Sequence, residues 1–335
     1  VFLLQKKAEA EIKTSSVVPE CQVIEPALYF IKSPLYPNKS QIFTIALIMG
    51  ALFPLIIFLL LDVINNKVIS KLDLEKLTKI KIIGIVGRNH SGNNLLTKLN
   101  PKSSVAEGFR SIRSNLEFQN KNNSNKVYLI TSSVSGEGKT FLASNLAIVF
   151  ANAGNKTLLI GADLRKPKLF SHFTLNNETG LSTLLSGKSS FDEVVSQTEV
   201  ENMDILSSGP LPSNPSDLFV GDEFGNLIEK AKQKYDRIII DTPPLGLVAD
   251  SFMIMQYTDV NLYVIRQNFT DKNFLRYVDD LNENNRIQNL YLILNDVSAG
   301  SGVYGYGNYG YGNYGYGYGY GSYVNDSDYF DDNEK

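Results

Sequence analysis

A glycine-containing loop at residues 133–140, with the sequence SVSGEGKT, has the clearest chemical pattern in this chain. An apolar run at 127–131 precedes the loop, and a helical pattern at 141–152 follows it. A loop of this composition between a strand and a helix is typical of phosphate binding, because its N–H groups converge on one point. Ser133 stands where such loops usually carry their first glycine. The context still predicts a phosphate-binding loop rather than a chance glycine-rich turn.

The individual residues of this loop suit a triphosphate and a magnesium ion. Gly136 and Gly138 allow a tight turn, so that successive N–H groups point at phosphate oxygens. Lys139 is expected to neutralise the β- and γ-phosphates, and the Thr140 hydroxyl is expected to bind Mg²⁺. The expected nucleotide-binding residues of the loop are Ser135, Gly136, Glu137, Gly138, Lys139, Thr140 and Phe141.

Two aspartates follow apolar runs and could complete this site. Asp241 ends the run at 237–240, and Asp163 comes shortly after the run at 157–160. A carboxylate at a strand end beside a phosphate-binding loop can bind Mg²⁺ directly or through water. Asp163 could also accept the proton of an attacking hydroxyl group. Taken singly, each aspartate could instead only cap a strand or begin a turn.

The elements that position these residues alternate between short apolar runs and helical segments after residue 126. Near-continuous Val, Ile and Leu runs separated by ten or more residues favour an α/β fold, a mostly parallel sheet with helices on both faces. Ligands of such sheets bind beyond the carboxyl ends of the strands. The predicted strands cover residues 127–131, 157–160, 204–206, 237–240, 261–265 and 290–294.

An amphipathic helix is predicted at residues 104–118, before the first of these strands. Glu107, Arg110 and Arg113 fall within about 120° of arc on this helix. These charges could contact a neighbouring subunit or could form only a solvated face. The apolar side chains at helical spacing are Val105, Phe109, Ile112 and Leu116.

A transmembrane helix is predicted at residues 41–61. Residues 42–61 are twenty residues with Thr44 as the only clearly polar side chain, which is enough to span a bilayer. A buried core helix is the alternative interpretation. Lysines are more frequent after this segment than before it, so the C-terminal part is expected to be cytoplasmic. The flanking lysines are Lys67, Lys71, Lys76, Lys79 and Lys81 after the segment, and Lys32 and Lys39 before it.

Composition limits the classes of partner and of site. The net charge of -3 gives no general reason to expect nucleic acid. Cys21 is the only cysteine, which excludes a disulfide framework or a cysteine-based zinc site within one chain. Residues 304–323 alternate Tyr with Gly, Asn and Ser, and so few aliphatic residues predict a flexible tail.

Taken together, these features resemble the bacterial tyrosine kinases, which are membrane-anchored co-polymerases that regulate capsule and exopolysaccharide synthesis. TSSVSGEGKT is similar to the first Walker motif of that family, LLIGADLRKP to its second aspartate motif, and IIIDTPP to its Walker B motif. EGFRSIRSNLEF resembles its ExxRxxR oligomerisation helix, and SSGPLPSNPSDL a loop of its catalytic domain. VIEPALYFIKSPLYP resembles the end of its periplasmic chain-length-determinant domain.

The resemblance implies a P-loop NTPase fold, with ATP and Mg²⁺ as cofactors. It implies an approach of Asn295 to adenine and the binding of a neighbouring subunit by Glu107, Arg110 and Arg113. The implied catalytic residues are Lys139, Asp163 and Asp241, and the implied magnesium-binding residues are Thr140, Asp163 and Asp241.

Autophosphorylation in trans is implied for the tyrosine-rich tail. The implied partners are further copies in a ring-like homo-oligomer, the polysaccharide polymerase and export machinery of a bacterial inner membrane, and a tyrosine phosphatase. The implied phosphoacceptors are Tyr304, Tyr306, Tyr309, Tyr311, Tyr314, Tyr316, Tyr318, Tyr320 and Tyr323.

The expected domain order follows from these assignments. Because the chain begins at Val1 and the resembling outer segment is short, we expect a fragment that lacks most of the periplasmic domain. The expected parts are the end of that domain at 1–40, the transmembrane helix at 41–61, a cytoplasmic linker at 62–103, the kinase domain at 104–298 and the tail at 299–335.

One departure from the family pattern keeps a second function open. The second aspartate motif of the family carries two aspartates, and Gly161 stands at the position of the first. The alternative is therefore an ATP-binding scaffold of the same export machinery, with weak catalysis or none. A third interpretation, a partitioning-type ATPase, is disfavoured because Val134 stands where those enzymes use a lysine.

Overall fold

The computed structural model describes residues 1–16, 37–99, 102–119, 126–246, 250–284 and 286–298, and it contains two units. The first unit, residues 1–65, holds α1 (Phe2–Ser15) and α2 (Lys39–Ile64). Within α2, Lys39–Leu60 has a mean hydropathy of 2.7 and is exposed, so this helix is long and apolar enough to cross a membrane. Pro54 lies inside α2, where a membrane environment tolerates it.

The second unit begins at Asn66 and is built on an eight-stranded sheet with the order β1-β8-β7-β2-β6-β3-β5-β4. Neighbouring strands are parallel except β4 and β5, which are antiparallel. The α/β fold predicted from the sequence is thus confirmed. The strands are β1 (Ile82–Gly87), β2 (Val127–Ser132), β3 (Thr157–Gly161), β4 (Val195–Gln197), β5 (Met203–Leu206), β6 (Arg237–Asp241), β7 (Val260–Arg266) and β8 (Leu290–Val297).

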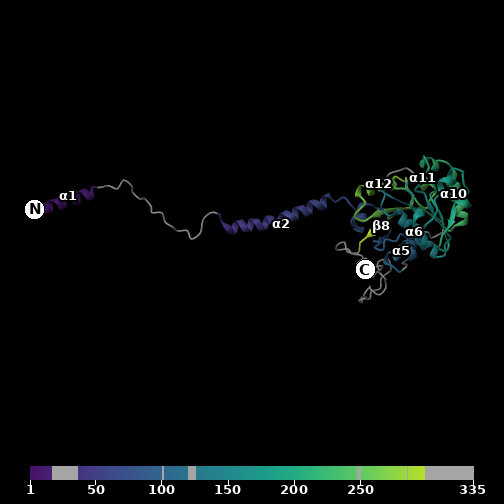
Figure 1. Ribbon diagram of the computed structural model, residues 1–335, viewed down its shortest axis with the longest axis horizontal. Helices are drawn as coiled ribbons and strands as arrows, with labels where there is room; N and C mark the ends of the chain where they lie inside the picture. Colours follow the sequence, from purple (N-terminus) through teal and green to yellow (C-terminus); the bar gives the residue numbers. More distant parts are fainter. Residues whose placement is uncertain (17–36, 100–101, 120–125, 247–249, 285, 299–335) are drawn as a thin grey trace. The chain divides into compact units, whose positions relative to one another are not determined.

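Helices cover both faces of this sheet, with α5 and α6 on one side and α10, α11 and α12 on the other (Figure 1). Side chains alternate between the two faces, so Tyr128 and Ile130 of β2 pack on the α6 side and Leu129 packs on the opposite side. The helices are α3 (Lys71–Leu77), α4 (Leu96–Leu99), α5 (Ser104–Gln119), α6 (Lys139–Asn152), α7 (Leu169–His172), α8 (Leu181–Leu185), α9 (Phe191–Val194), η1 (Ser216–Phe219), α10 (Glu223–Lys234), α11 (Asp250–Met255) and α12 (Lys272–Glu283).

The amphipathic helix predicted at 104–118 is α5, and its four apolar residues are buried as expected. The six predicted strands are β2, β3, β5, β6, β7 and β8, each within a few residues of the expected bounds. The carboxyl ends of the central strands therefore carry the residues that the sequence singled out.

The predicted linker at 62–103 is corrected by the structure, because the described part of this segment from residue 66 onward belongs to the second unit. It contributes α3, α4 and the edge strand β1, which pairs with β8. The two glycines of IIGIVG weaken the strand signal in the sequence. A Cβ on Gly84 would lie 2.2 Å from Ile112 Cγ1, so glycine lets α5 pack directly on β1. The compact unit therefore begins before residue 104.

Candidate nucleotide-binding site

The loop at 133–140 joins the central strand β2 to α6. Gly136 and Gly138 have φ angles of 95° and 97°, a left-handed conformation that glycine adopts without strain. Gly138 is also the N-cap of α6, so the loop and the helix N-terminus offer their N–H groups together. Both glycines occupy the conformation that a phosphate-binding turn requires.

Ser133, at the position of the usual first glycine, is fully buried. The Tyr263 hydroxyl of β7 donates a hydrogen bond to Ser133 Oγ at 2.8 Å. The serine side chain is therefore accommodated by a polar partner rather than left unsatisfied in the core.

Glu137 braces the loop from inside the protein. Its fully buried carboxylate accepts hydrogen bonds from the Val134 N–H at 2.8 Å and from the Thr270 hydroxyl. Its carbonyl accepts a hydrogen bond from Asn295 Nδ2 at 2.9 Å. The expected contribution of Glu137 to nucleotide binding thus falls to its backbone, and an adenine contact of Asn295 stays a prediction.

The loop between β7 and α12 connects this site to the segment that begins the second unit. Val68 donates its N–H to the Thr270 carbonyl at 2.9 Å and accepts the Asn268 N–H at 2.8 Å. Arg266, the last residue of β7, donates from Nη1 to the Gly136 carbonyl at 2.9 Å. The segment around Val68 and the phosphate-binding loop are therefore both attached to the end of β7 and the loop that follows it.

Lys139 lies almost fully buried, with its Nζ donating to Ser132 Oγ at 3.2 Å. Burial lowers the pKa of this ammonium group, while the negative charges of Asp241, Asp163 and Glu137 act in the opposite direction. A buried cation facing carboxylates across the loop is placed to compensate phosphate charge.

Thr140 and Asp241 meet at the ends of α6 and β6. Thr140 Oγ1 donates to Asp241 Oδ2 at 2.7 Å, and Oδ1 of the same carboxylate is buried without a partner among the described residues. Burial raises the pKa of Asp241 to about 7, although the Thr140 hydrogen bond and the charge of Lys139 act to lower it. A buried carboxylate oxygen of this kind is placed to bind a cation.

The donor set fits Mg²⁺ held together with a nucleotide. Mg²⁺ prefers oxygen ligands and is usually bound by one or two carboxylates together with substrate phosphates. Among the described residues, no group of three or more His, Cys, Asp or Glu side chains is placed to hold a metal ion. Thr140 and Asp241 could therefore hold the ion jointly with phosphate oxygens.

Asp163 follows β3, the strand next to β6, and its partly buried carboxylate contributes to the raised pKa of Asp241. Its Oδ1 accepts hydrogen bonds from the N–H groups of Arg165 at 3.2 Å and Lys166 at 3.0 Å. At Gly161 a Cβ would lie 2.9 Å from Ser208 Oγ, so Ser208 occupies the space beside the glycine. The structure thus brings together Lys139, Asp163 and Asp241.

The other predicted residues lie on α5 and α6. Glu107 and Arg110 form an ion pair at 2.5 Å, and Arg113 Nη1 lies 3.5 Å from the Val149 carbonyl of α6. Their contact with a neighbouring subunit stays a prediction. The Phe141 ring packs edge-on against Phe109 with centroids 5.7 Å apart, so its expected contribution to nucleotide binding falls to its N–H group.

Comparison with known proteins decides the family. Residues 125–286 match the family model described as an AAA domain. Tyrosine-protein kinase YwqD of Bacillus subtilis is 41% identical over 179 residues, which are 53% of this chain and 76% of the relative. The chain belongs to the bacterial tyrosine kinase family.

Two further bacterial tyrosine kinases extend this similarity. Tyrosine-protein kinase ptk of Acinetobacter johnsonii is 30% identical over 314 residues, 90% of this chain, which spans 43% of that relative. The kinase domain of Escherichia coli tyrosine kinase ETK has a TM-score of 0.66 and 28% identity, covering 75% of this chain and 99% of that domain. The family assignment made from the motifs is confirmed.

Several residues around this bacterial tyrosine kinase site were not predicted from the sequence. Arg165 lies within the quoted aspartate motif, which is a signal that could have found it. Thr270 and Asp250 carry no local signal, because a threonine in a loop and an aspartate at the start of a helix are ordinary residues. Their contacts come from distant parts of the chain.

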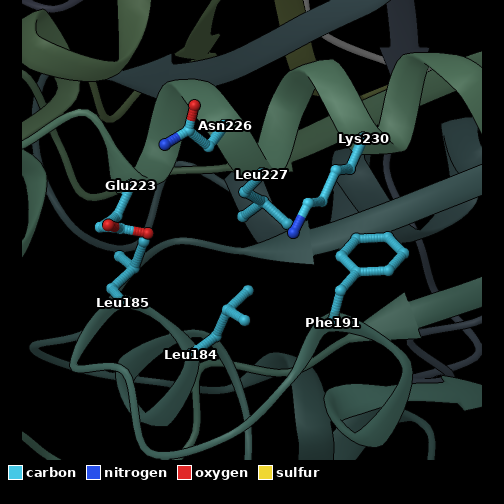
Figure 2. Close-up of a pocket in the computed structure, with 7 residues that line it drawn as sticks. All are labelled: Leu184, Leu185, Phe191, Glu223, Asn226, Leu227 and Lys230. Atoms are coloured by element: carbon cyan, nitrogen blue, oxygen red, sulfur yellow. The ribbon is translucent and has the colours of Figure 1, made fainter.

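A pocket lies between α10 and the residues of α8 and α9 (Figure 2). Figure 2 shows Leu227 and Lys230 extending from α10 toward Leu184 and Phe191. None of the lining residues belongs to the nucleotide site, so we assign this pocket no role in phosphoryl transfer. The lining residues are Leu184, Leu185, Phe191, Glu223, Asn226, Leu227 and Lys230.

The nine tyrosines predicted to accept phosphate, at positions 304–323, lie outside the described residues. Residues 17–36 of the expected periplasmic segment do so as well. Their proposed roles therefore rest on sequence and family.

Proposed function

We propose that this chain is an ATP-dependent protein tyrosine kinase that phosphorylates its own C-terminal tyrosine cluster in trans. The observation that carries the proposal is the buried Oδ1 of Asp241, which has no partner within the described part of the chain and lies beside the Thr140 hydroxyl and the charge of Lys139. Asp163, which follows the strand next to β6, adds a second carboxylate at the same sheet edge. Family membership supports tyrosine as the acceptor.

Each residue has a role that its position supports. The N–H groups of the loop and of the α6 N-terminus bind the phosphates, and Lys139 compensates their charge. ATP supplies the transferable phosphoryl group, and Mg²⁺ reduces its negative charge when bound. Thr140 and Asp241 would hold the ion, and Asp163 would bind one of its waters. Asp163 accepts the proton of the tyrosine hydroxyl.

Substrate and assembly follow from the same proposal. The kinase unit faces the cytoplasm of a bacterial inner membrane, with α2 as its anchor, and Glu107, Arg110 and Arg113 join copies into a ring. Each tail phosphate adds about 1.5 to 2 negative charges, so repulsion between phosphorylated tails opens the ring. A phosphatase reverses the modification, and the cycle regulates capsule or exopolysaccharide synthesis and export.

The proposal is tested by incubating the purified full chain with Mg²⁺ and ATP labelled on the γ-phosphate. We expect label on tyrosine, no label without Mg²⁺, and loss of labelling in Lys139→Met. Lys156→Met is the matched control, because Lys156 is exposed and its N–H binds Asp236 at 2.9 Å, outside the site. Release of free phosphate without phosphotyrosine would contradict a kinase and favour an ATPase.

Transfer in trans is tested by mixing two variants, neither of which can label its own tail. A Lys139→Met chain supplies the acceptor tail, and a chain ending at Ser298 supplies the active site. Label on the Lys139→Met chain supports transfer between copies. Labelling that occurs only within intact single chains would contradict it.

Gly161 favours a second candidate function, an ATP-binding scaffold with weak catalysis or none. The space beside Gly161 holds the Ser208 hydroxyl, which donates to the Gly161 carbonyl at 2.8 Å, rather than a carboxylate. A lost catalytic group of this kind typically reduces the rate by roughly 10²–10⁴. ATP binding that changes assembly without labelling or phosphate release would support the scaffold.

A further inference from the structure

An ionic cluster around one buried carboxylate lies beside the proposed kinase site, at the first residue of α11. Asp250 is 1% exposed, and Arg165 Nε donates to its Oδ2 at 2.9 Å. Its other oxygen, Oδ1, accepts from Ser216 Oγ at 2.6 Å and from Arg165 Nη2 at 3.4 Å. Arg165 Nη2 also donates to Ser216 Oγ at 2.7 Å, which closes the cluster. Three segments far apart in the sequence therefore meet at one carboxylate.

The same arginine belongs to the turn that carries Asp163. The Asp163 carboxylate accepts the N–H groups of Arg165 and Lys166, so the turn folds around its own acidic side chain. At the other end of the turn, the Ala162 N–H donates to the Asp241 carbonyl at 2.8 Å. The turn is thus held by β6 at one end and by Asp250 at the other.

The start of α11 also contacts the loop that follows Asp241. Ser251 Oγ donates to the Pro243 carbonyl at 2.7 Å. The adjacent residues Asp250 and Ser251 thereby attach one helix end to the turn that carries Asp163 and to the loop that follows Asp241. These contacts add to the direct pairing of β3 with β6 in holding the two segments side by side.

We infer that Asp250 is a positioning residue, which acts through Arg165 to hold the Asp163 carboxylate against the phosphoryl-transfer site. This inference rests on the proposed kinase function and adds a residue to it. Asp250 touches neither substrate nor nucleotide in this role. Its carboxylate matters because a misplacement of about 1 Å at a catalytic group can lower a rate roughly 10²-fold.

A purely structural role predicts a different result. If Asp250 only stabilises the fold, its replacement lowers the unfolding temperature but leaves the turnover of the folded chain unchanged. If it acts through Asp163, its effect on turnover disappears once the Asp163 carboxylate is gone, because residues that work as one unit are not additive.

The test is a double-mutant cycle in the full chain, using Asp250→Asn, Asp163→Asn and the double variant. Turnover and KM for ATP are measured from phosphotyrosine formation, and thermal unfolding is measured alongside. We expect Asp250→Asn to lower turnover roughly tenfold, with a change in KM of less than about twofold. In the Asp163→Asn background, the same change should lower the remaining turnover by less than about twofold.

Two further variants keep the result interpretable. Ser216→Ala removes one hydrogen bond to Asp250 and keeps the ion pair, so it should lower turnover by a smaller factor than Asp250→Asn. If the Asp250→Asn chain does not fold, Ser216→Ala takes its place in the cycle. Asp204→Asn is the control, since Asp204 also accepts a side-chain hydrogen bond, from Tyr235 at 2.7 Å, near the amino end of β5. It should lower stability without changing turnover.

Equal losses from Asp250→Asn in both backgrounds, or no loss in either, overturn the inference. Failure of the proposed function is visible separately, as absence of phosphotyrosine in the unsubstituted chain. If that chain releases free phosphate instead, the double-mutant cycle is repeated with the rate of phosphate release as the measured quantity, and this result decides the role of Asp250. Absence of both reactions overturns the proposed function and the inference together.

Discussion

The hydroxyl of Thr140 donates a hydrogen bond to Asp241 at 2.7 Å, while the second oxygen of that carboxylate is buried without a partner among the described residues. One oxygen is thus satisfied by the helix that follows the phosphate-binding loop, and the other is left for a cation. Without a cation, the ionised carboxylate is unfavourable in a buried site. Protonation of Asp241 should therefore affect the stability of the folded chain, which can be measured.

Stability of the chain free of nucleotide and Mg²⁺ should fall as the pH rises from about 4 to 7. The pKa of Asp241 is raised from 3.8 to about 7 in the folded chain, so the unfolded chain binds fewer protons in this window. The contribution of Asp241 to the free energy of unfolding should decrease by up to about 1.4 kcal/mol per pH unit. Denaturant unfolding at several pH values measures it.

The matched variant for this measurement is Asp241→Asn, which keeps the shape and removes the titration. We expect the difference in unfolding free energy between the two chains to be largest near pH 7 and smallest near pH 4. A difference that does not depend on pH would show that Asp241 titrates normally.

Replacement of Thr270 by Val should weaken ATP binding as well as stability. The change removes the hydroxyl that donates to the buried carboxylate of Glu137, which costs about 1–3 kcal/mol for an unsatisfied buried acceptor. Because Glu137 braces the phosphate-binding loop, we expect a loss of about 1 kcal/mol in ATP affinity, roughly fivefold in Kd. Titration calorimetry with Mg²⁺ and ATP measures the affinity.

Thr258→Val is the control for Thr270→Val. The Thr258 hydroxyl donates to Met255 at 2.8 Å, before the start of β7 and outside the site. It should lower stability and leave the Kd for ATP unchanged. Equal changes of Kd in both variants would contradict the proposal that Thr270 and Glu137 support the phosphate-binding loop.

Restoration of a carboxylate at position 161 should raise the rate of tyrosine phosphorylation. The added Cβ of Gly161→Asp would lie 2.9 Å from Ser208 Oγ, so we expect the full increase, roughly tenfold or more, only together with Ser208→Ala. Initial rates of tail labelling measure it. Gly161→Asn with Ser208→Ala has the same size without the charge, and an equal increase there would exclude a role for the carboxylate.

Replacement of Arg110 by Ala should reduce self-association and tail labelling together. Arg110 is 41% exposed in its ion pair with Glu107, so its loss should cost less than about 1 kcal/mol of folding stability. Sedimentation and labelling of the same samples test the link between assembly and reaction. Lys188→Ala, at an exposed residue outside α5, is the control. Unchanged labelling in an Arg110→Ala chain that no longer self-associates would contradict the proposed dependence of tail labelling on assembly.

Much of the fold was predictable because its signals are local. The buried runs of β2, β3 and β6, and the apolar spacing of α5, reflect burial of neighbouring residues that the sequence displays directly. β1 escaped prediction because it is a glycine-containing edge strand, and pairing with β8 and packing beneath Ile112 stabilise it. Such contacts join residues that are far apart along the chain.

The sequence by itself determined the phosphate-binding loop, the two aspartates Asp163 and Asp241, the apolar α2 and the tyrosine-rich composition of the tail. These are properties of residue type and short spacing. Only the tertiary structure decided that Glu137 points inward to Thr270 and that Asp250 binds Arg165. The reason is physical: a buried polar group takes whichever partner the packed strands and loops bring within hydrogen-bond distance, and sequence separation does not record that distance.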